Sequence, residues 1–178
     1  MVGVVTRYAA MLRGINLGSR NRVAMPALRE LFEALRFTDV ETYVQSGNVV
    51  FSASSKPDAA GIATRIAKDL GVESPVIIRT ASELGKLVRG NPFTGDTGAF
   101  HVTLLGDKPK AADVAAIDGA RFAPDEFAVV GRDVYLRCPK GYGVSKLGNA
   151  FWEKKLKTVA TTRNWKTITA LRDRTASA

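Results

Sequence analysis

The chain has 178 residues, which suits one ordinary domain or two small packed halves and is enough to bury a substantial core. Hydrophobic residues make up 46% of the sequence and charged residues 24%, a composition that excludes collagen, coiled coil and wholesale disorder. No apolar run approaches the ~18 residues of a membrane span, and no signal-peptide pattern opens the chain. We therefore expect a cytoplasmic protein that does not bind membranes.

The sequence contains one cysteine, Cys138, and one histidine, His101. A single cysteine cannot form a disulfide within the chain. With only one histidine beside it, neither a Cys/His zinc site nor a serine–histidine–aspartate triad is readily built. We expect no metal ion and no cofactor, and we interpret both residues as structural.

The net charge of +9 is concentrated in two segments. Residues Arg137–Arg174 include ten basic and two acidic side chains, a net charge of +8, and Arg13–Arg22 includes three arginines and no acid. Such clustering is typical of a surface that binds anions. The alternative is that some of these residues, such as Lys154 and Lys155, simply form the solvated face of a helix.

The first half of the chain is predicted to run β-α-β-β-α-β. The apolar run Thr6–Leu12 indicates a buried strand that stops at the following Arg-Gly pair. Apolar residues between Met25 and Leu35 recur at helical spacing behind Pro26, which suits a first helical turn. The remaining elements are a hairpin that turns at Ser46-Gly47, a helix that begins after Asp58 and ends at Gly71, and a strand over Pro75–Arg79.

The second half is predicted to follow a connecting helix that opens with Thr80 and Glu83 in capping-box spacing and ends before Gly90. We place the domain boundary there, which gives domains of residues 1–90 and 91–178. The expected elements are a strand over Phe100–Leu105, a helix over Lys110–Ile117, strands over Phe127–Val130 and Val134–Cys138, and helices over Leu147–Leu156 and Thr162–Leu171. This order is β-α-β-β-α-α.

Both halves share a β-α-β-β-α frame, which predicts an α+β protein of two ferredoxin-like (α/β plait) subdomains packed together as a pseudo-duplication. We recognise no repeat at the level of residues. Right-handed crossovers make the strands before Arg13 and before Gln45 parallel. The segment Arg13–Arg22 and the hairpin turn Gln45–Asn48 should therefore emerge at the same end of the sheet.

Together these two segments offer guanidinium, amide and hydroxyl groups, along with glycines that let backbone N–H groups approach a ligand. The candidate ligand-binding residues of the first half are Arg13, Asn16, Gln45, Ser46 and Asn48. The structural alternative is that the glycines only permit tight turns. Neither this loop nor the later one at Gly141–Lys146 matches a dinucleotide fingerprint or a nucleotide phosphate loop.

In the second half, the segment Lys140–Lys146 precedes a predicted helix that Ser145 would cap, and a helix N-terminus favours an anion. Tyr142 is a candidate to stack on a base. The candidate ligand-binding residues here are Lys140, Tyr142, Ser145, Lys146, Arg163 and Asn164, which we expect to form one pocket. Trp165 fits the apolar face of the last helix and is interpreted as core.

Four sequence blocks carry a resemblance to a known family. They are RYAAMLRGINLG at residues 7–18, TYVQSGNVVF at 42–51, PKGYGVSKL at 139–147 and ATTRNW at 160–165. In this order they resemble domain-of-unknown-function family 1697 (DUF1697), a bacterial family of small α/β proteins. The resemblance implies two plait-like subdomains and brings no established reaction, substrate or cofactor.

We interpret the protein as a module that binds an anionic ligand, with nucleic acid narrowly ahead of a small phosphorylated molecule. One alternative is an enzyme that acts on a phosphorylated or nucleotide substrate through Ser145, Lys146, Arg163 and Glu153. Another is a homo-oligomeric scaffold whose basic face meets a protein. The oligomeric state and the relative orientation of the two halves do not follow from the sequence.

Overall fold

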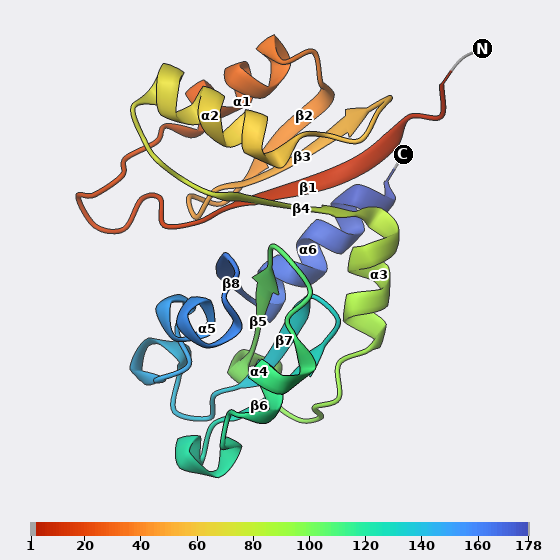
Figure 1. Ribbon diagram of the computed structural model, residues 1–178. Coiled ribbons are helices and arrows are strands. Elements are labelled where there is room, and N and C mark those ends of the chain that lie inside the picture. Colours follow the sequence, from red (N-terminus) through yellow and green to blue (C-terminus); the bar gives the residue numbers. More distant parts are fainter. Residues whose placement is uncertain (1–2, 178) are drawn as a thin grey trace. The chain divides into compact units, whose positions relative to one another are not determined.

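In the computed structural model, which describes residues 3–177, the first half of the chain forms a four-stranded sheet with two helices on one face (Figure 1). In chain order its elements are β1 (Thr6–Leu12), α1 (Met25–Ala34), β2 (Thr38–Tyr43), β3 (Asn48–Ala53), α2 (Ala59–Leu70) and β4 (Val76–Thr80). The strands lie in the order β2-β3-β1-β4, and each neighbouring pair is antiparallel. This is the predicted plait.

The second half repeats this arrangement after the connecting helix α3 (Ala81–Arg89). Its elements are β5 (Phe100–Leu105), α4 (Ala111–Ala115), β6 (Glu126–Val130), β7 (Asp133–Arg137), α5 (Asn149–Leu156), β8 (Ala160–Asn164) and α6 (Trp165–Ala176), with short 3₁₀ turns η1 (Thr97–Ala99), η2 (Gly119–Phe122) and η3 (Tyr142–Val144). The strand order β6-β7-β5-β8 matches that of the first sheet. No helix within residues 3–177 is long and apolar enough to cross a membrane.

One prediction was wrong, because the last helix begins later than its sequence pattern suggested. Residues Ala160–Asn164 form the edge strand β8, which pairs with β5, and α6 starts only at Trp165. Thr161 and Thr162 are β-branched, a residue type that favours strands. The second half is therefore β-α-β-β-α-β followed by a helix, and its sheet is complete.

The central strands of the first sheet are buried on both faces. All six residues of β3 and the five residues from Tyr8 to Leu12 in β1 are buried. On the helix-covered face the rings of Tyr8 and Phe51 stack with centroids 5.7 Å apart, and Phe32 of α1 packs edge-on against Phe51. A strand without a solvent face loses the alternation of polar and apolar residues, which explains the continuous apolar run in β1.

The core of the second sheet is centred on Trp152 of α5, which has no exposed surface. Its ring lies 5.1 Å from Phe127 and 5.0 Å from Phe151, and its Nε1–H donates to the carbonyl of Leu147 at 3.0 Å. The hydrogen bond satisfies the one polar group of the ring. Trp152 therefore stabilises the core and presents no face to a ligand.

The two halves do share a repeat at the level of residues, at the junctions between β4 and α3 and between β8 and α6. Each junction places a buried arginine, Arg79 or Arg163, directly before the residue that caps the helix. The caps are Thr80 and Asn164, and each side chain accepts from the backbone N–H three residues later. The repeat was missed because the two arginines are followed by different capping residues.

Residue contacts divide the chain into two units. The first unit holds the residues up to Lys86 together with those from Leu171 onward, and the second holds Leu87–Ala170. The division falls inside α3, four residues before the boundary expected from Gly90. The return of the C-terminal segment to the first unit was not expected from the sequence.

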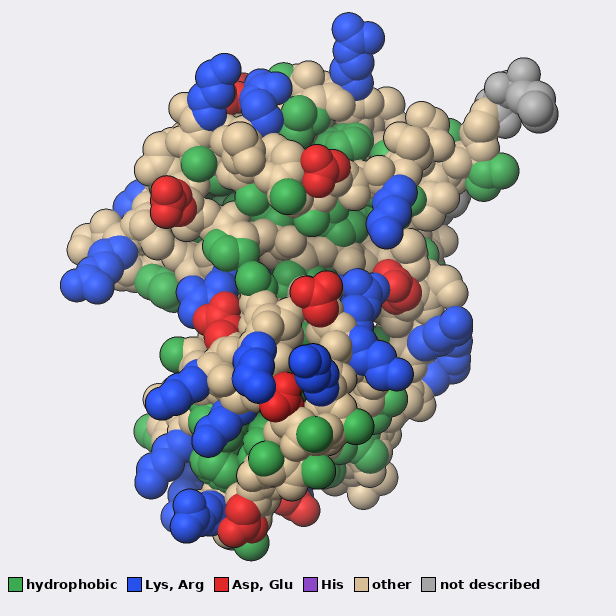
Figure 2. Space-filling view, in the orientation of Figure 1, with side chains coloured by type: hydrophobic (Ala, Val, Ile, Leu, Met, Phe, Trp, Pro, Cys, Tyr) green, Lys and Arg blue, Asp and Glu red, His purple; other side chains and the backbone are tan. Residues whose placement is uncertain are grey.

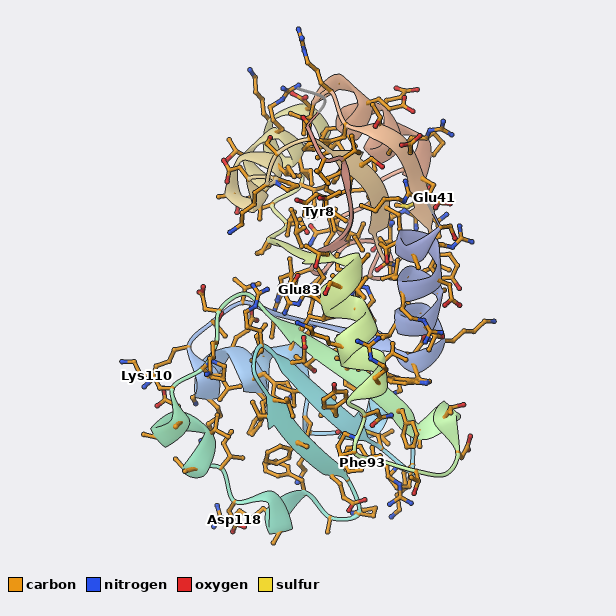
Figure 3. All side chains as sticks on the ribbon, turned by 90° about the vertical axis from the view of Figure 1, so that its right-hand side faces the viewer. Tyr8, Glu41, Glu83, Phe93, Lys110 and Asp118 are labelled. Atoms are coloured by element: carbon orange, nitrogen blue, oxygen red, sulfur yellow. The ribbon has the colours of Figure 1, made fainter. Side chains whose placement is uncertain are left out.

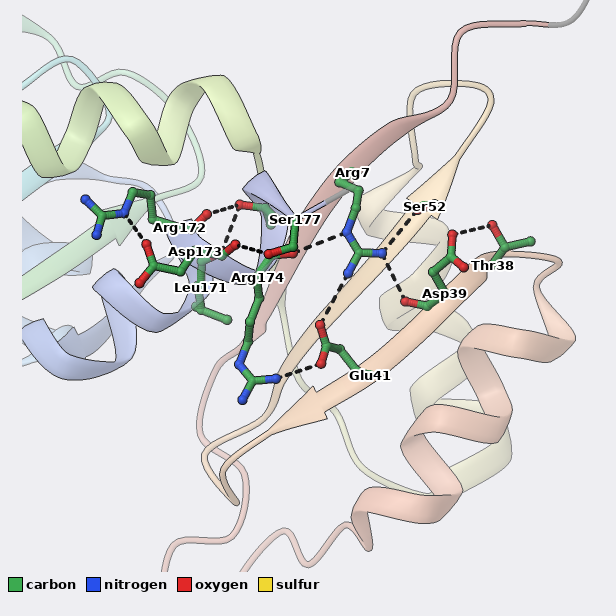
Figure 4. Close-up of polar contacts among 11 residues, drawn as sticks. Arg7, Thr38, Asp39, Glu41, Ser52, Leu171, Arg172, Asp173, Arg174 and Ser177 are labelled. Carbon is green, nitrogen blue, oxygen red and sulfur yellow. Dashed lines mark hydrogen bonds and ion pairs between the residues drawn. The ribbon is translucent and has the colours of Figure 1, made fainter.

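The C-terminal segment contacts the first sheet through a charged group centred on Glu41 of β2 (Figures 3 and 4). One carboxylate oxygen of Glu41 accepts from Arg174 at 2.6 Å and the other accepts from Arg7 of β1 at 3.3 Å. Arg7 also donates to the carbonyl of Arg174, and the Arg174 guanidinium lies 4.7 Å from the centroid of the Tyr43 ring. Glu41 thus joins the segment to two strands.

We predict that the substitution Glu41→Gln lowers the free energy of unfolding by about 1–2 kcal/mol, because a charged acceptor shared by two arginines is replaced by a neutral one. The control is Glu33→Gln on α1, where an exposed pair with Arg29 contributes only about 0.3–0.5 kcal/mol. Urea unfolding of the full chain measures both. A loss for Glu41→Gln no larger than that of the control contradicts the role of this cluster.

Candidate anion-binding sites

The predicted contact between the loop after β1 and the β2–β3 hairpin is present. The side-chain amide of Asn16 donates to the carbonyl of Gln45 at 2.8 Å and to the carbonyl of Val23 at 3.0 Å. Its oxygen accepts from the backbone N–H of Val23 at 2.8 Å. Both donor hydrogens of the amide are used, so Asn16 organises the loop on the hairpin.

Gly47 is the point at which the loop rests on the hairpin. Its φ of +84° lies in the left-handed region, and a Cβ added there would lie 2.5 Å from Cδ1 of Ile15. Ile15 is almost fully buried, and the N–H of Leu12 donates to the carbonyl of Gly47 at 2.8 Å. Only glycine satisfies both the backbone conformation and the close approach.

Two other candidate residues of the hairpin have structural contacts. The amide of Asn48, which is fully buried, donates to the carbonyl of Tyr43 at 2.9 Å and to the hydroxyl of Ser46 at 3.0 Å. These bonds close the turn from β2 into β3. The motif Gln45-Ser46-Gly47-Asn48 therefore has a complete structural explanation apart from the side chain of Gln45, which is exposed.

An open cavity of about 580 Å³ lies where the loop after β1 meets the β2–β3 hairpin. It is lined by Asn16, Arg22, Val23, Ala24 and Gln45. Arg22 is the one charged residue in its lining, and its guanidinium also donates to the carbonyl of Gly18. Arg13 is half-buried, and its backbone is tied to Ser74 and Pro75. The first-half candidates thus lie together, but few of their charged groups converge on one point.

The second unit contains a smaller cavity with more charge. Its volume is about 170 Å³, and its lining includes the cationic side chains of Arg121, Lys140 and Lys146 and the carboxylate of Asp125. Two loops build it, the one that enters β6 and the one that leaves β7. We call this cavity the anion pocket. Basic side chains gather over α5 and the neighbouring loops in Figure 2.

The loop after β7 is shaped by its own backbone rather than by a helix cap. Gly141, with a φ of +99°, donates its N–H to the carbonyl of Cys138, and η3 follows directly. The prediction that Ser145 caps the next helix was wrong. The Ser145 hydroxyl accepts from the N–H of Leu147, and α5 begins only at Asn149. The helix α5 therefore begins three residues after Lys146, with Gly148 and not Ser145 at its N-cap.

Arg163 does not line the anion pocket. It lies in β8 with 7% of its surface exposed, and its guanidinium donates to the Thr161 hydroxyl at 2.8 Å and to the Thr162 carbonyl at 3.0 Å. Burial lowers the pKa of Arg163 to about 10, an effect that nearby Tyr142 partly offsets. Tyr142 is thus close to Arg163 as expected, but the pocket of the two lysines is completed by residues 121–125 instead.

Tyr142 has one ring face covered, because it stacks on His101 at 4.8 Å. Desolvation lowers the pKa of His101 and so favours the neutral imidazole. Burial likewise raises the pKa of the Cys138 thiol, so this cysteine stays protonated. Asn164 is exposed and caps α6.

Sequence reasoning missed Arg121 and Asp125 as members of the anion pocket. The segment 118–126 carries one arginine among three acidic residues, so a count of charges gives no signal there. Pro124 indicates a loop but says nothing about which other loop it meets. Within residues 3–177 no group of three or more histidine, cysteine or carboxylate side chains is placed to hold a metal ion.

We predict that Gly47→Ala lowers the free energy of unfolding by about 2–4 kcal/mol, because it adds both left-handed strain and a clash with Ile15. Gly18→Ala is the matched control. Gly18 has a φ of +61°, and nothing lies within 4 Å of an added Cβ. That variant carries only the backbone cost of about 1 kcal/mol. Equal losses in thermal unfolding of the two variants would show that the loop does not press on Gly47.

Comparisons with known proteins give a family and a structural neighbour. No match emerges from the curated proteins. Among solved structures, the chain is similar to the conserved bacterial protein SP0830 from Streptococcus pneumoniae, with 20% identity, a TM-score of 0.73, and coverage of 98% of this chain and 100% of that one. This likeness shows the fold. The model of a protein family of unknown function, DUF1697, matches residues 5–135 and so covers both the loop and the hairpin of the first unit. The chain belongs to the DUF1697 family.

Proposed function

We propose that the protein binds an anionic ligand through the anion pocket and that the group bound there is a phosphoryl group. The observation that carries this proposal is a cavity whose lining includes Arg121, Lys140 and Lys146 and a single acidic residue, Asp125. Arg121 also forms an exposed ion pair with Asp118 at 3.7 Å, so the two lysines supply its unshared positive charge. Cationic side chains from different loops attract an anionic ligand most strongly where they surround it. Lys140 and Lys146 are both exposed, so a ligand reaches them from solvent.

The size of the pocket favours a single phosphoryl group over a stretch of nucleic acid. Its volume of about 170 Å³ lies below the range of about 300–1,000 Å³ typical of small-molecule sites, so the pocket suits a small group. The aromatic residues that could stack on bases are also engaged: Trp152 is buried, Tyr142 stacks on His101, and Trp165 packs against Phe100. Single-strand binding usually depends on exposed aromatic faces beside the basic residues.

An enzyme that uses Ser145, Lys146, Arg163 and Glu153 receives less support from the geometry. Ser145 accepts from a backbone N–H in its own loop, and Glu153 accepts from the N–H of Ala160 at 3.3 Å. Arg163 is buried within β8. These groups stabilise loops and strands, and they do not converge on the anion pocket, which leaves binding as the better-supported function.

The proposal predicts that inorganic phosphate binds the full chain at low ionic strength. The backbone amide resonances of residues 121–123, 125 and 140–146 should then shift in a ¹⁵N NMR titration. Lys140→Ala and Lys146→Ala should each weaken binding about fivefold, equivalent to about 1 kcal/mol. The control is the pair Lys154→Ala and Lys155→Ala, two exposed lysines of α5 that do not line the pocket. Equal weakening by all four substitutions would indicate a diffuse charge effect and no site.

Salt dependence separates a phosphoryl-group site from a nucleic-acid surface. A surface that contacts four to six phosphates gives a slope of log affinity against log salt of roughly −3 to −5. We expect a labelled oligonucleotide to bind weakly and an isolated phosphoryl ligand to show a shallower slope, because only two or three charges are neutralised. A steep slope with tight oligonucleotide binding would instead support the nucleic-acid function that the basic stretch Arg137–Arg174 suggests.

A further inference from the structure

A second cavity adjoins the anion pocket. It has a volume of about 470 Å³, and its lining includes Phe93, Ala120 and Phe127. Figure 3 shows Phe93 in the segment that leads from α3 to β5. The two cavities share the three consecutive residues Ala123–Asp125, which form a common wall. We call the second cavity the ring groove.

The ring groove differs from the anion pocket in its chemistry. Its apolar lining is made of Phe93, Ala120, Ala123, Pro124 and Phe127, and no cationic residue is among the residues that line it. Phe93 also packs against Phe100 and Phe127 against Trp152, so each ring offers the groove only the surface that its neighbour leaves open. Its charged residues are Asp125 and Glu126, and Glu126 is paired with Arg137 at 2.6 Å. Carboxylates repel a phosphoryl group and accept hydrogen bonds from hydroxyl or amino groups. The groove therefore suits a neutral, flat group that carries hydrogen-bond donors.

Because the two cavities share a wall but differ in charge, a ligand that occupies both has one favoured orientation. A ligand that spans the wall would place its negative charge beside Arg121, Lys140 and Lys146 and its neutral end in the cavity that Phe93 and Phe127 help to line. The reverse orientation would bring the phosphoryl group against two carboxylates and leave three cations facing an apolar ring. Ligand sites generally combine an apolar cleft of about 300–1,000 Å³ with a few polar groups that fix orientation, and the paired cavities match that pattern.

We propose that the ligand is a phosphate monoester of an aromatic or similarly flat group, with the phosphoryl group in the anion pocket and the ring in the ring groove. This inference rests on the proposed function and deepens it by naming the class of ligand. Two kinds of molecule share this chemistry, a nucleoside monophosphate and a simple aryl phosphate. The nucleoside adds ribose hydroxyls, which could donate to Asp125 or Glu126.

The test titrates the full chain with inorganic phosphate, phenyl phosphate and adenosine monophosphate under one set of buffer conditions. We expect phenyl phosphate to bind at least about tenfold more tightly than inorganic phosphate, because its ring leaves water on binding. If both esters bind more tightly than inorganic phosphate, tighter binding of adenosine monophosphate than of phenyl phosphate supports the inference and assigns a nucleotide. The opposite order, with both tighter than inorganic phosphate, supports it and assigns an aryl ester.

A variant at Ala120 locates the ring. Ala120 is exposed and lines the ring groove but not the anion pocket, so Ala120→Trp should fill the groove without disturbing the core. We expect this change to reduce phenyl phosphate binding to the level of inorganic phosphate while leaving inorganic phosphate binding unchanged. The matched control is Ala112→Trp on α4, an exposed alanine outside both cavities, and Ala120→Leu is a smaller substitution if the tryptophan variant fails to fold.

Failure of this inference and failure of the proposed function give different results. If inorganic phosphate does not bind even at low salt, the proposed function is wrong and the ligand class falls with it. If inorganic phosphate binds in the anion pocket but phenyl phosphate binds no more tightly, the ring-groove inference alone is overturned. Tighter binding of phenyl phosphate that Ala120→Trp does not affect also overturns it, since the ring then lies elsewhere.

Discussion

The central strands of the first sheet have no solvent-facing side, and this burial limits where polar side chains are free to contact a ligand. Polar groups on such strands must be satisfied within the protein, because burying an unpaired polar group is costly. Asn48 in β3 follows this rule by closing the β2–β3 turn with its amide. The burial of Val102–Leu105 in β5 imposes the same limit on the second sheet. The cavities proposed above to bind a ligand accordingly lie in loops that flank the strands.

The two units elaborate the same plait at different ends. In the first unit the long connection lies between β1 and α1 and carries Arg13–Arg22, whereas the equivalent connection after β5 is only Gly106–Lys110. In the second unit the long connections enter β6 and leave β7, and they build the anion pocket. Hydrogen bonds from Leu12 to Gly47 and from Leu105 to Arg132 mark equivalent points of the two frames. Loop length, on a common scaffold, is what distinguishes the units.

The sequence predicted most of the fold because its signals there are local. Thr80 and Glu83 form the capping box that their spacing indicates, and Gly71 ends α2 in a left-handed conformation. The strand β8 was missed because its short polar sequence is stabilised by pairing with β5, a contact distant in the chain. Arg121 was missed for a related reason, since only the folded chain brings its loop to Lys140 and Lys146. Contacts between segments distant in the chain cannot be predicted from local sequence patterns, because tertiary packing can override local propensity.

The return of the C-terminal segment to the first unit has a consequence for biosynthesis. A ribosome releases the chain from its N-terminus, so β1 to β4 emerge well before Arg174. Domains commonly fold as they emerge. The contact between Arg174 and Glu41, however, cannot form until the second unit has been translated. The ion pair between Arg174 and Glu41 is therefore one of the last contacts of the first unit that can form during synthesis, although the strands that it joins are made first.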